Sequence, residues 1–69
     1  MINKPATNML NTDQAASYLG LARATLEAWR TRGGGPVFIK LGKSVRYRLP
    51  DLDNFILSRM KKNTAQDAE

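Results

Sequence analysis

Residues 24–48 read ATLEAWRTRGGGPVFIKLGKSVRYR, and within this stretch the spacing of the apolar side chains changes. Leu26 and Trp29 lie three residues apart among good helix formers, which predicts a helix over residues 22–32. Three glycines and a proline at residues 33–36 end that helix. Beyond them the apolar residues follow the alternation of a β-strand. The stretch therefore predicts a helix followed by β-structure.

Two β-rich runs, residues 37–41 and 45–49, flank the short loop Gly42-Lys43-Ser44. A glycine-containing loop of this length between such runs is typical of a β-hairpin. Successive side chains of a strand point to opposite faces. We therefore expect one set to face the core and another to share the outer surface, namely Val45, Tyr47 and Leu49 in the first set, and Arg46 and Arg48 in the second.

A short helix is predicted upstream, between Asn11 and Gly20. Asn11 and Gln14 have the spacing of a capping box, with Thr12 as the rival cap. Gly20 ends the element because glycine adopts a positive φ at little cost. One face of this helix carries the expected core residues Ala15, Ala16 and Leu19.

A third helix is predicted after the hairpin. Pro50 suits a first helical position, and Asp51 and Asp53 complement the positive end of the helix dipole. Lys61 and Lys62 are expected to close the helix. Amphipathic spacing assigns the core positions Leu52, Phe55, Ile56 and Met60.

The order helix, helix, hairpin, helix predicts a small α+β winged helix-turn-helix. Ala16 lets the first two helices cross closely, and Gly20 makes the sharp turn between them. The second helix is expected to be pinned against the first by Leu21, Leu26 and Trp29. Its outer face is then free to enter a groove of DNA. The alternative is an αα-hairpin that merely packs.

The boundaries expected from these patterns are a flexible lead-in over residues 1–9, the domain over residues 10–62, and a flexible tail over residues 63–69. A domain of this size buries only about 60% of its unfolded surface. The sequence has no cysteine and no histidine, which removes the usual zinc ligands and the best proton-transfer side chain. Its few carboxylates show no convergent pairing suited to acid–base work. We expect no enzymatic activity and no metal site.

Charge is distributed unevenly along the chain. The whole sequence carries a net charge of +5. Residues 14–50 hold seven basic residues and one acid, Glu27, for a net charge of +6. Such a one-sided field favours polyanions, and the phosphate backbone of nucleic acid is the commonest of these. The alternative is an ordinary solvated basic surface.

Nothing in the sequence predicts a membrane segment or a signal peptide. No apolar run approaches the roughly 20 residues that span a bilayer. Residues 1–8 contain Lys4 but no apolar core of a signal sequence. We therefore expect a cytoplasmic, nucleoid-associated protein.

Residues 11–57, about two-thirds of the chain, resemble the excisionase-like and AlpA-like branch of the MerR-type winged helix-turn-helix domains. The matching stretches are TDQAASYLGL (12–21), ATLEAWRTRGGGP (24–36), FIKLGKSVRYR (38–48) and DLDNFI (51–56). The resemblance implies a winged-helix fold with no enzymatic activity and no cofactor. It also implies a role in phage or mobile-element biology, either in directing excision by a recombinase or in regulating transcription.

The resemblance places the DNA contacts of the second helix on its outward residues Ala22, Arg23, Thr25 and Arg30. Ala22 replaces the polar residue common in the family, so a phosphate hydrogen bond is missing there. Glu27 stands where relatives carry a residue suited to base or backbone contact. It could accept from a cytosine amine or pair with Arg23 or Arg30; we favour pairing.

The wing contacts implied by the resemblance are Lys43, Ser44 and Arg46, with Lys40 as a flanking phosphate contact. Arg48 either joins them or bridges to Asp51 at the start of the next helix. Trp29 and Tyr47 could stack on single-stranded bases, but both lie at core-facing positions, and we favour packing.

The function expected is sequence-specific binding of double-stranded DNA, with a recombinase or RNA polymerase as protein partner. One domain makes a small footprint, so cooperative self-association on DNA is also expected. The alternative is a protein-interaction adaptor, such as an anti-repressor or a replication or packaging accessory, whose basic face docks an acidic partner.

Overall fold

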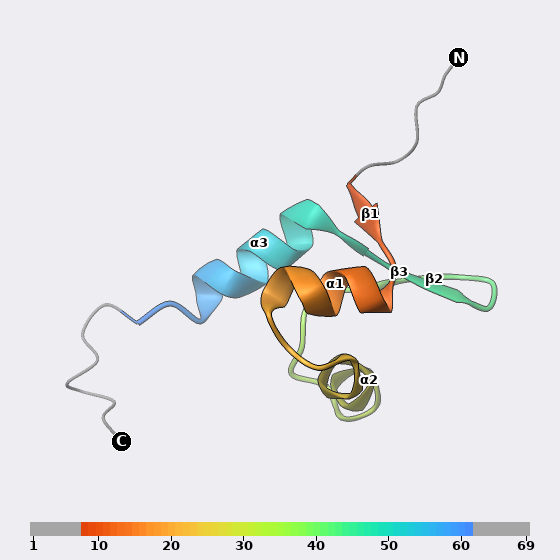
Figure 1. The fold of residues 1–69 in the computed structure, drawn as a ribbon, viewed down its shortest axis with the longest axis horizontal. Helices are drawn as coiled ribbons and strands as arrows, with labels where there is room; N and C mark the ends of the chain where they lie inside the picture. The colour runs from red at the N-terminus through yellow and green to blue at the C-terminus, as the bar shows by residue number, and fades with distance from the viewer. Residues whose placement is uncertain (1–7, 62–69) are drawn as a thin grey trace, which may run out of the picture.

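The computed structural model describes residues 8–61, in which three helices accompany a three-stranded antiparallel sheet (Figure 1). The elements in chain order are β1 (Met9–Leu10), α1 (Thr12–Leu19), α2 (Arg23–Arg32), β2 (Ile39–Leu41), β3 (Ser44–Arg48) and α3 (Leu49–Ser58). The strand order in the sheet is β1-β3-β2. The predicted order of helix, helix, hairpin and helix is confirmed, and the fold is a small α+β winged helix-turn-helix.

Local hydrogen bonds fix both ends of α1 as the sequence predicts. The backbone N–H of Gln14 donates to the Asn11 side chain at 2.8 Å, and the Asn11 N–H donates to the Gln14 side chain at 2.9 Å. This capping box satisfies backbone donors that the helix leaves without partners. At the other end Gly20 has a φ of 72°, and the Leu21 N–H donates to the Ala16 carbonyl at 2.9 Å. The chain thereby turns sharply into α2.

The glycines after α2 serve two different purposes. Gly33 and Gly34 have φ values of 90° and 98°, which residues other than glycine rarely adopt. Gly35 is needed for space instead. A Cβ at Gly35 would lie 2.7 Å from the Cβ of Trp29 and 2.8 Å from its ring atom Cε3. The loop can therefore pass over Trp29 only without a side chain at this position.

The hairpin is shorter than predicted, because the strands begin at Ile39 and end at Arg48 rather than at residues 37 and 49. Leu41 pairs with Ser44, leaving a two-residue turn whose first residue, Gly42, has a φ of 62°. This conformation suits the type II′ turn, whose twist matches that of the strands. The hairpin projects away from the helices (Figure 1).

A third strand, β1, was not predicted, and assigning Met9 to a flexible lead-in was wrong. Met9 pairs with Arg48 and Leu10 pairs with Tyr47. The Leu49 N–H also donates to the carbonyl of Asn8 at 2.8 Å. Two residues are too few to show an alternating pattern, so β1 is set by its partner strand. Residues 1–7, and the tail predicted at residues 63–69, lie outside the described residues.

The core joins every layer of the fold and contains Ala15, Ala16, Leu26, Tyr47 and Leu52, all at most 3% exposed. Leu10, Leu19, Trp29 and Val45 pack against it while partly buried. These residues come from α1, α2, α3 and the sheet, so one cluster holds all of the elements together. The predicted core face of α1 is confirmed, as are Val45 and Tyr47 on β3 and the packing of Trp29. Leu49 instead begins α3 and is half-buried outside this cluster.

Three core assignments were wrong. Ile56 and Met60 are 39% and 66% exposed, because only the first part of α3 packs on the core while its end extends beyond α1 (Figure 1). Leu21 is 41% exposed because it lies in the turn between α1 and α2.

The last helix also ends earlier than predicted, at Ser58 rather than near Lys62, which lies outside the described residues. The Ser58 hydroxyl donates to the Phe55 carbonyl at 2.7 Å. The guanidinium of Arg59 lies 4.7 Å from the Phe55 ring centroid and donates to the Gly34 carbonyl at 2.8 Å. These contacts fasten the end of α3 to the loop that follows α2.

Gly35→Ala should lower the free energy of unfolding by about 1–3 kcal/mol, because the new methyl group overlaps the Trp29 side chain close to its backbone. Thermal and urea denaturation followed by circular dichroism would measure the loss. Ser17→Ala, on the exposed face of α1, is the control and should change stability by less than about 0.5 kcal/mol. Equal stabilities of the two variants would show that the loop has room to move.

Candidate nucleic-acid interface

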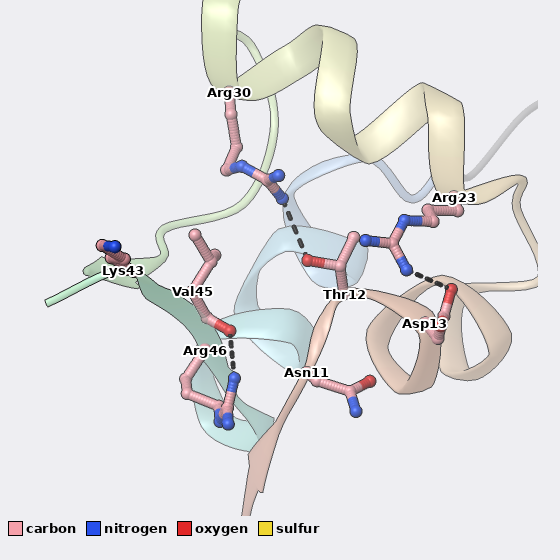
Figure 2. A pocket seen from close by; sticks show the side chains of 8 residues that line it. All are labelled: Asn11, Thr12, Asp13, Arg23, Arg30, Lys43, Val45 and Arg46. Atoms are coloured by element: carbon pink, nitrogen blue, oxygen red, sulfur yellow. Dashed lines mark hydrogen bonds and ion pairs between the residues drawn. The ribbon is translucent and has the colours of Figure 1, made fainter. Parts of the chain in front are cut away.

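Two adjoining hollows lie between the start of α1, the face of α2 and the hairpin. The first, of about 300 Å³, is lined by the cations Arg23, Arg30, Lys43 and Arg46 (Figure 2). The second, of about 570 Å³, is lined by the cations Arg30, Lys40 and Lys43. Basic side chains from the predicted recognition helix and from the predicted wing therefore meet in one place.

Arg30 does not lie free on the outer face of α2. Its Nη1 atom donates to the Thr12 hydroxyl at 3.1 Å and to the Tyr47 hydroxyl at 3.0 Å. Figure 2 shows the side chain extending from α2 towards Thr12. Because Tyr47 is only 1% exposed, its hydroxyl needs such a partner. Arg30 therefore connects α2 to both α1 and β3.

Arg23 is held by two carboxylates. Its Nη1 lies 2.9 Å from Asp13 and its Nε lies 2.8 Å from Glu27. Hydrogen bonds to Glu27 and then to Asp13, with the attraction of both charges, raise the pKa of the Arg23 guanidinium above its usual value. The favoured pairing of Glu27 is confirmed, and its partner is Arg23. The pair is about half exposed, so it is accessible to a ligand.

The two remaining residues predicted on α2 lie apart from the hollows. Ala22 is the N-cap residue and makes no side-chain capping hydrogen bond, in keeping with its missing hydroxyl. Thr25 is half-buried, and its backbone N–H donates to the Ala22 carbonyl at 3.0 Å.

The wing residues differ in their surroundings. Lys43 in the turn lines both hollows, and Lys40 lines the second. The Nη1 of Arg46 donates to the neighbouring Val45 carbonyl at 2.8 Å, which holds the guanidinium along the strand beside the first hollow. Arg48 forms the predicted bridge, with its Nε 3.4 Å from Asp51, and lines neither hollow. Ser44 is exposed beside the turn.

Several lining residues were not foreseen from the sequence. Asn11, Thr12 and Asp13 belong to the start of α1, and Phe38 lines the second hollow while its ring centroid lies 6.2 Å from that of Tyr47. Asp13 borders the acid-poor segment, which is a signal that could have singled it out. Nothing in the local pattern indicates that Thr12 accepts from Arg30.

Residues 9–60 match a family of helix-turn-helix domains. The chain belongs to this helix-turn-helix domain family. None of the curated proteins compared with it matches the chain. The family match covers the helices, the hairpin and all of the residues that line the hollows, so this is a DNA-binding helix-turn-helix protein.

The described part of the chain has two further properties. None of its helices is long and apolar enough to cross a bilayer. Residues 8–61 contain no group of three or more acidic, cysteine or histidine residues able to hold a metal ion.

Asp13→Asn should strengthen binding to duplexes of random sequence by about two- to fivefold at low salt, because it removes a negative charge from the basic hollow. The gain should shrink as salt screens the interaction. Fluorescence anisotropy with a labelled duplex would measure it. Asp53→Asn removes the same charge from α3, where Asp53 accepts from Tyr18 and lines neither hollow. An equal gain for both variants would mean that net charge, rather than position, is responsible.

Proposed function

We propose that this protein binds double-stranded DNA in a sequence-specific manner, as an excisionase-like recombination directionality factor or as a transcriptional regulator of a phage or mobile element. The family supports DNA binding, and the resemblance of the wing segment to excisionase-like proteins supports the narrower role. Either role implies a recombinase or RNA polymerase as protein partner and cooperative binding of neighbouring copies.

The observation that carries the proposal is the convergence of Arg23, Arg30, Lys43 and Arg46 on one hollow between α2 and the hairpin (Figure 2). A helix of this kind enters the major groove, while a basic ribbon beside it reaches phosphates or the adjacent minor groove. Phosphate contacts fix the position of the protein on the duplex, and contacts to base edges select the sequence.

Arg23 and Glu27 are the best candidates for sequence selection. Both lie on the first half of α2, and both side chains are about half exposed. The ion pair orients each group, so that the guanidinium can donate to guanine or the carboxylate can accept from a cytosine amine. Each good contact of this type discriminates between bases by about 1–3 kcal/mol.

Lys40, Lys43, Ser44 and Arg46 are candidates for backbone contacts of the wing, with Arg48 as the most peripheral because of its bridge to Asp51. A flexible ammonium in a two-residue turn is suited to a point-charge contact with phosphate. Ala22 and Thr25 at the start of α2 complete the proposed surface.

This division of labour predicts different effects for two substitutions. Arg23→Ala should reduce the preference for the selected sequence, whereas Lys43→Ala should weaken binding to all duplexes alike. Sites are first selected from a random duplex pool, and affinities for the best site and for a scrambled site are then measured by mobility shift at several salt concentrations.

Equal losses on selected and scrambled duplexes for both variants would contradict the assignment of roles. If the unmodified protein retains no duplex at low salt, the DNA-binding proposal fails and the adaptor function is favoured. The spacing of half-sites in the selected pool would also report how many copies bind together.

A further inference from the structure

Arg30 has an unusual environment for a residue of a DNA-reading helix. It is half-buried, and its guanidinium is fixed by hydroxyls from α1 and β3 rather than by an acid. Within residues 8–61 it forms no ion pair, whereas Arg23 on the same helix has two. A partly desolvated cation without a counter-charge is costly, and an anionic ligand relieves that cost.

The hydrogen bonds leave the other side of the guanidinium available. Arginine carries five N–H donors in a planar fork. Both hydroxyl contacts use the same nitrogen, Nη1. The donors on Nε and Nη2 can therefore form the parallel pair of bonds that arginine makes with a phosphate.

A second cation lies where such a ligand would be held. Arg30 and Lys43 are the two cations that line both hollows, one from α2 and the other from the hairpin turn. Arg46 adds a positive charge to the first hollow, and the negative charge of Asp13 is paired there with Arg23. An anion between Arg30 and Lys43 would thus be attracted from both sides.

We propose that the first hollow binds one backbone phosphate of duplex DNA between Arg30 and Lys43. Thr12 and Tyr47 are then positioning residues for the Arg30 guanidinium. The inference rests on the proposed DNA-binding function and deepens it. Arg30 then binds the phosphate whatever the base sequence, although its place in α2 suggests that it reads bases. Base selection is left to the exposed side chains of Arg23 and Glu27 in the first half of α2.

The test compares Arg30→Gln with Arg32→Gln in salt-dependent binding to a random-sequence duplex. Both variants remove one positive charge from α2, but Arg32 is exposed and lines neither hollow. The slope of log Kobs against log salt is negative, and loss of one phosphate contact reduces its magnitude by about 1. We expect this change, and a loss of affinity of about tenfold at low salt, for Arg30→Gln but not for Arg32→Gln.

Tyr47→Phe tests the positioning role, since it keeps the buried ring but removes the hydroxyl that accepts from Arg30. It should weaken duplex binding several-fold while leaving the salt slope unchanged, because all of the charges remain. The thermal midpoint of each variant, read by circular dichroism, identifies losses that come from unfolding instead.

A direct measurement avoids any dependence on folded variants. In the intact protein, the side-chain Nε–Hε resonance of Arg30 should shift in NMR spectra when a short duplex is added. An unmoved resonance in a protein that binds DNA would overturn the proposal. So would an equal salt slope for Arg30→Gln and unmodified protein, or a loss confined to one selected sequence. Failure of the unmodified protein to bind any duplex would refute the DNA-binding function itself.

Discussion

The hydrogen bonds that Arg30 makes with Tyr47 and Thr12 join α2 to β3 and to the start of α1. Tyr47 is the central point, because it lies in β3, between the other two strands, and its ring is buried in the core. Within residues 8–61 its hydroxyl accepts a hydrogen bond from Arg30, which reaches across from α2. The angle between α2 and the hairpin beside it is therefore set by a partly buried polar contact as well as by apolar packing.

The far side of α2 is fixed by a different set of contacts. The Trp29 and Phe55 rings lie 5.4 Å apart at an angle of 59°, a tilted arrangement favourable for aromatic pairs. Arg59 covers Phe55 and binds the carbonyl of Gly34, so the glycine loop is attached to α3. A chain of 69 residues with a small apolar core is thus held together partly by arginine side chains and by loops attached to helices, where a larger protein would have more core.

The features that were predictable from sequence are those determined within a few residues. Asn11 and Gln14 form their capping box locally, and the glycine-containing turn lies within the predicted loop, although Ser44 belongs to β3 rather than to that loop. The pairing of Met9 with Arg48 is a contact between distant residues, and its two-residue strand carries no pattern. Spacing alone also placed Met60 in the core, because periodicity shows which residues share a helix face but not whether another element covers it. The same limit applies at the site, where the family resemblance named Arg30 as a DNA contact but could not show that Thr12 and Tyr47 accept hydrogen bonds from it.

The tight turn at Gly42 has a mechanical consequence. A hairpin closed by two residues has few alternative conformations, so little chain entropy is lost when its tip becomes fixed on a surface. In the proposed contact of the hairpin with DNA, the same stiffness would prevent the tip from adjusting to grooves of different width. Any mismatch in shape would then be taken up by deformation of the double helix, and sequences that bend or narrow easily would be preferred even at base pairs that no side chain touches.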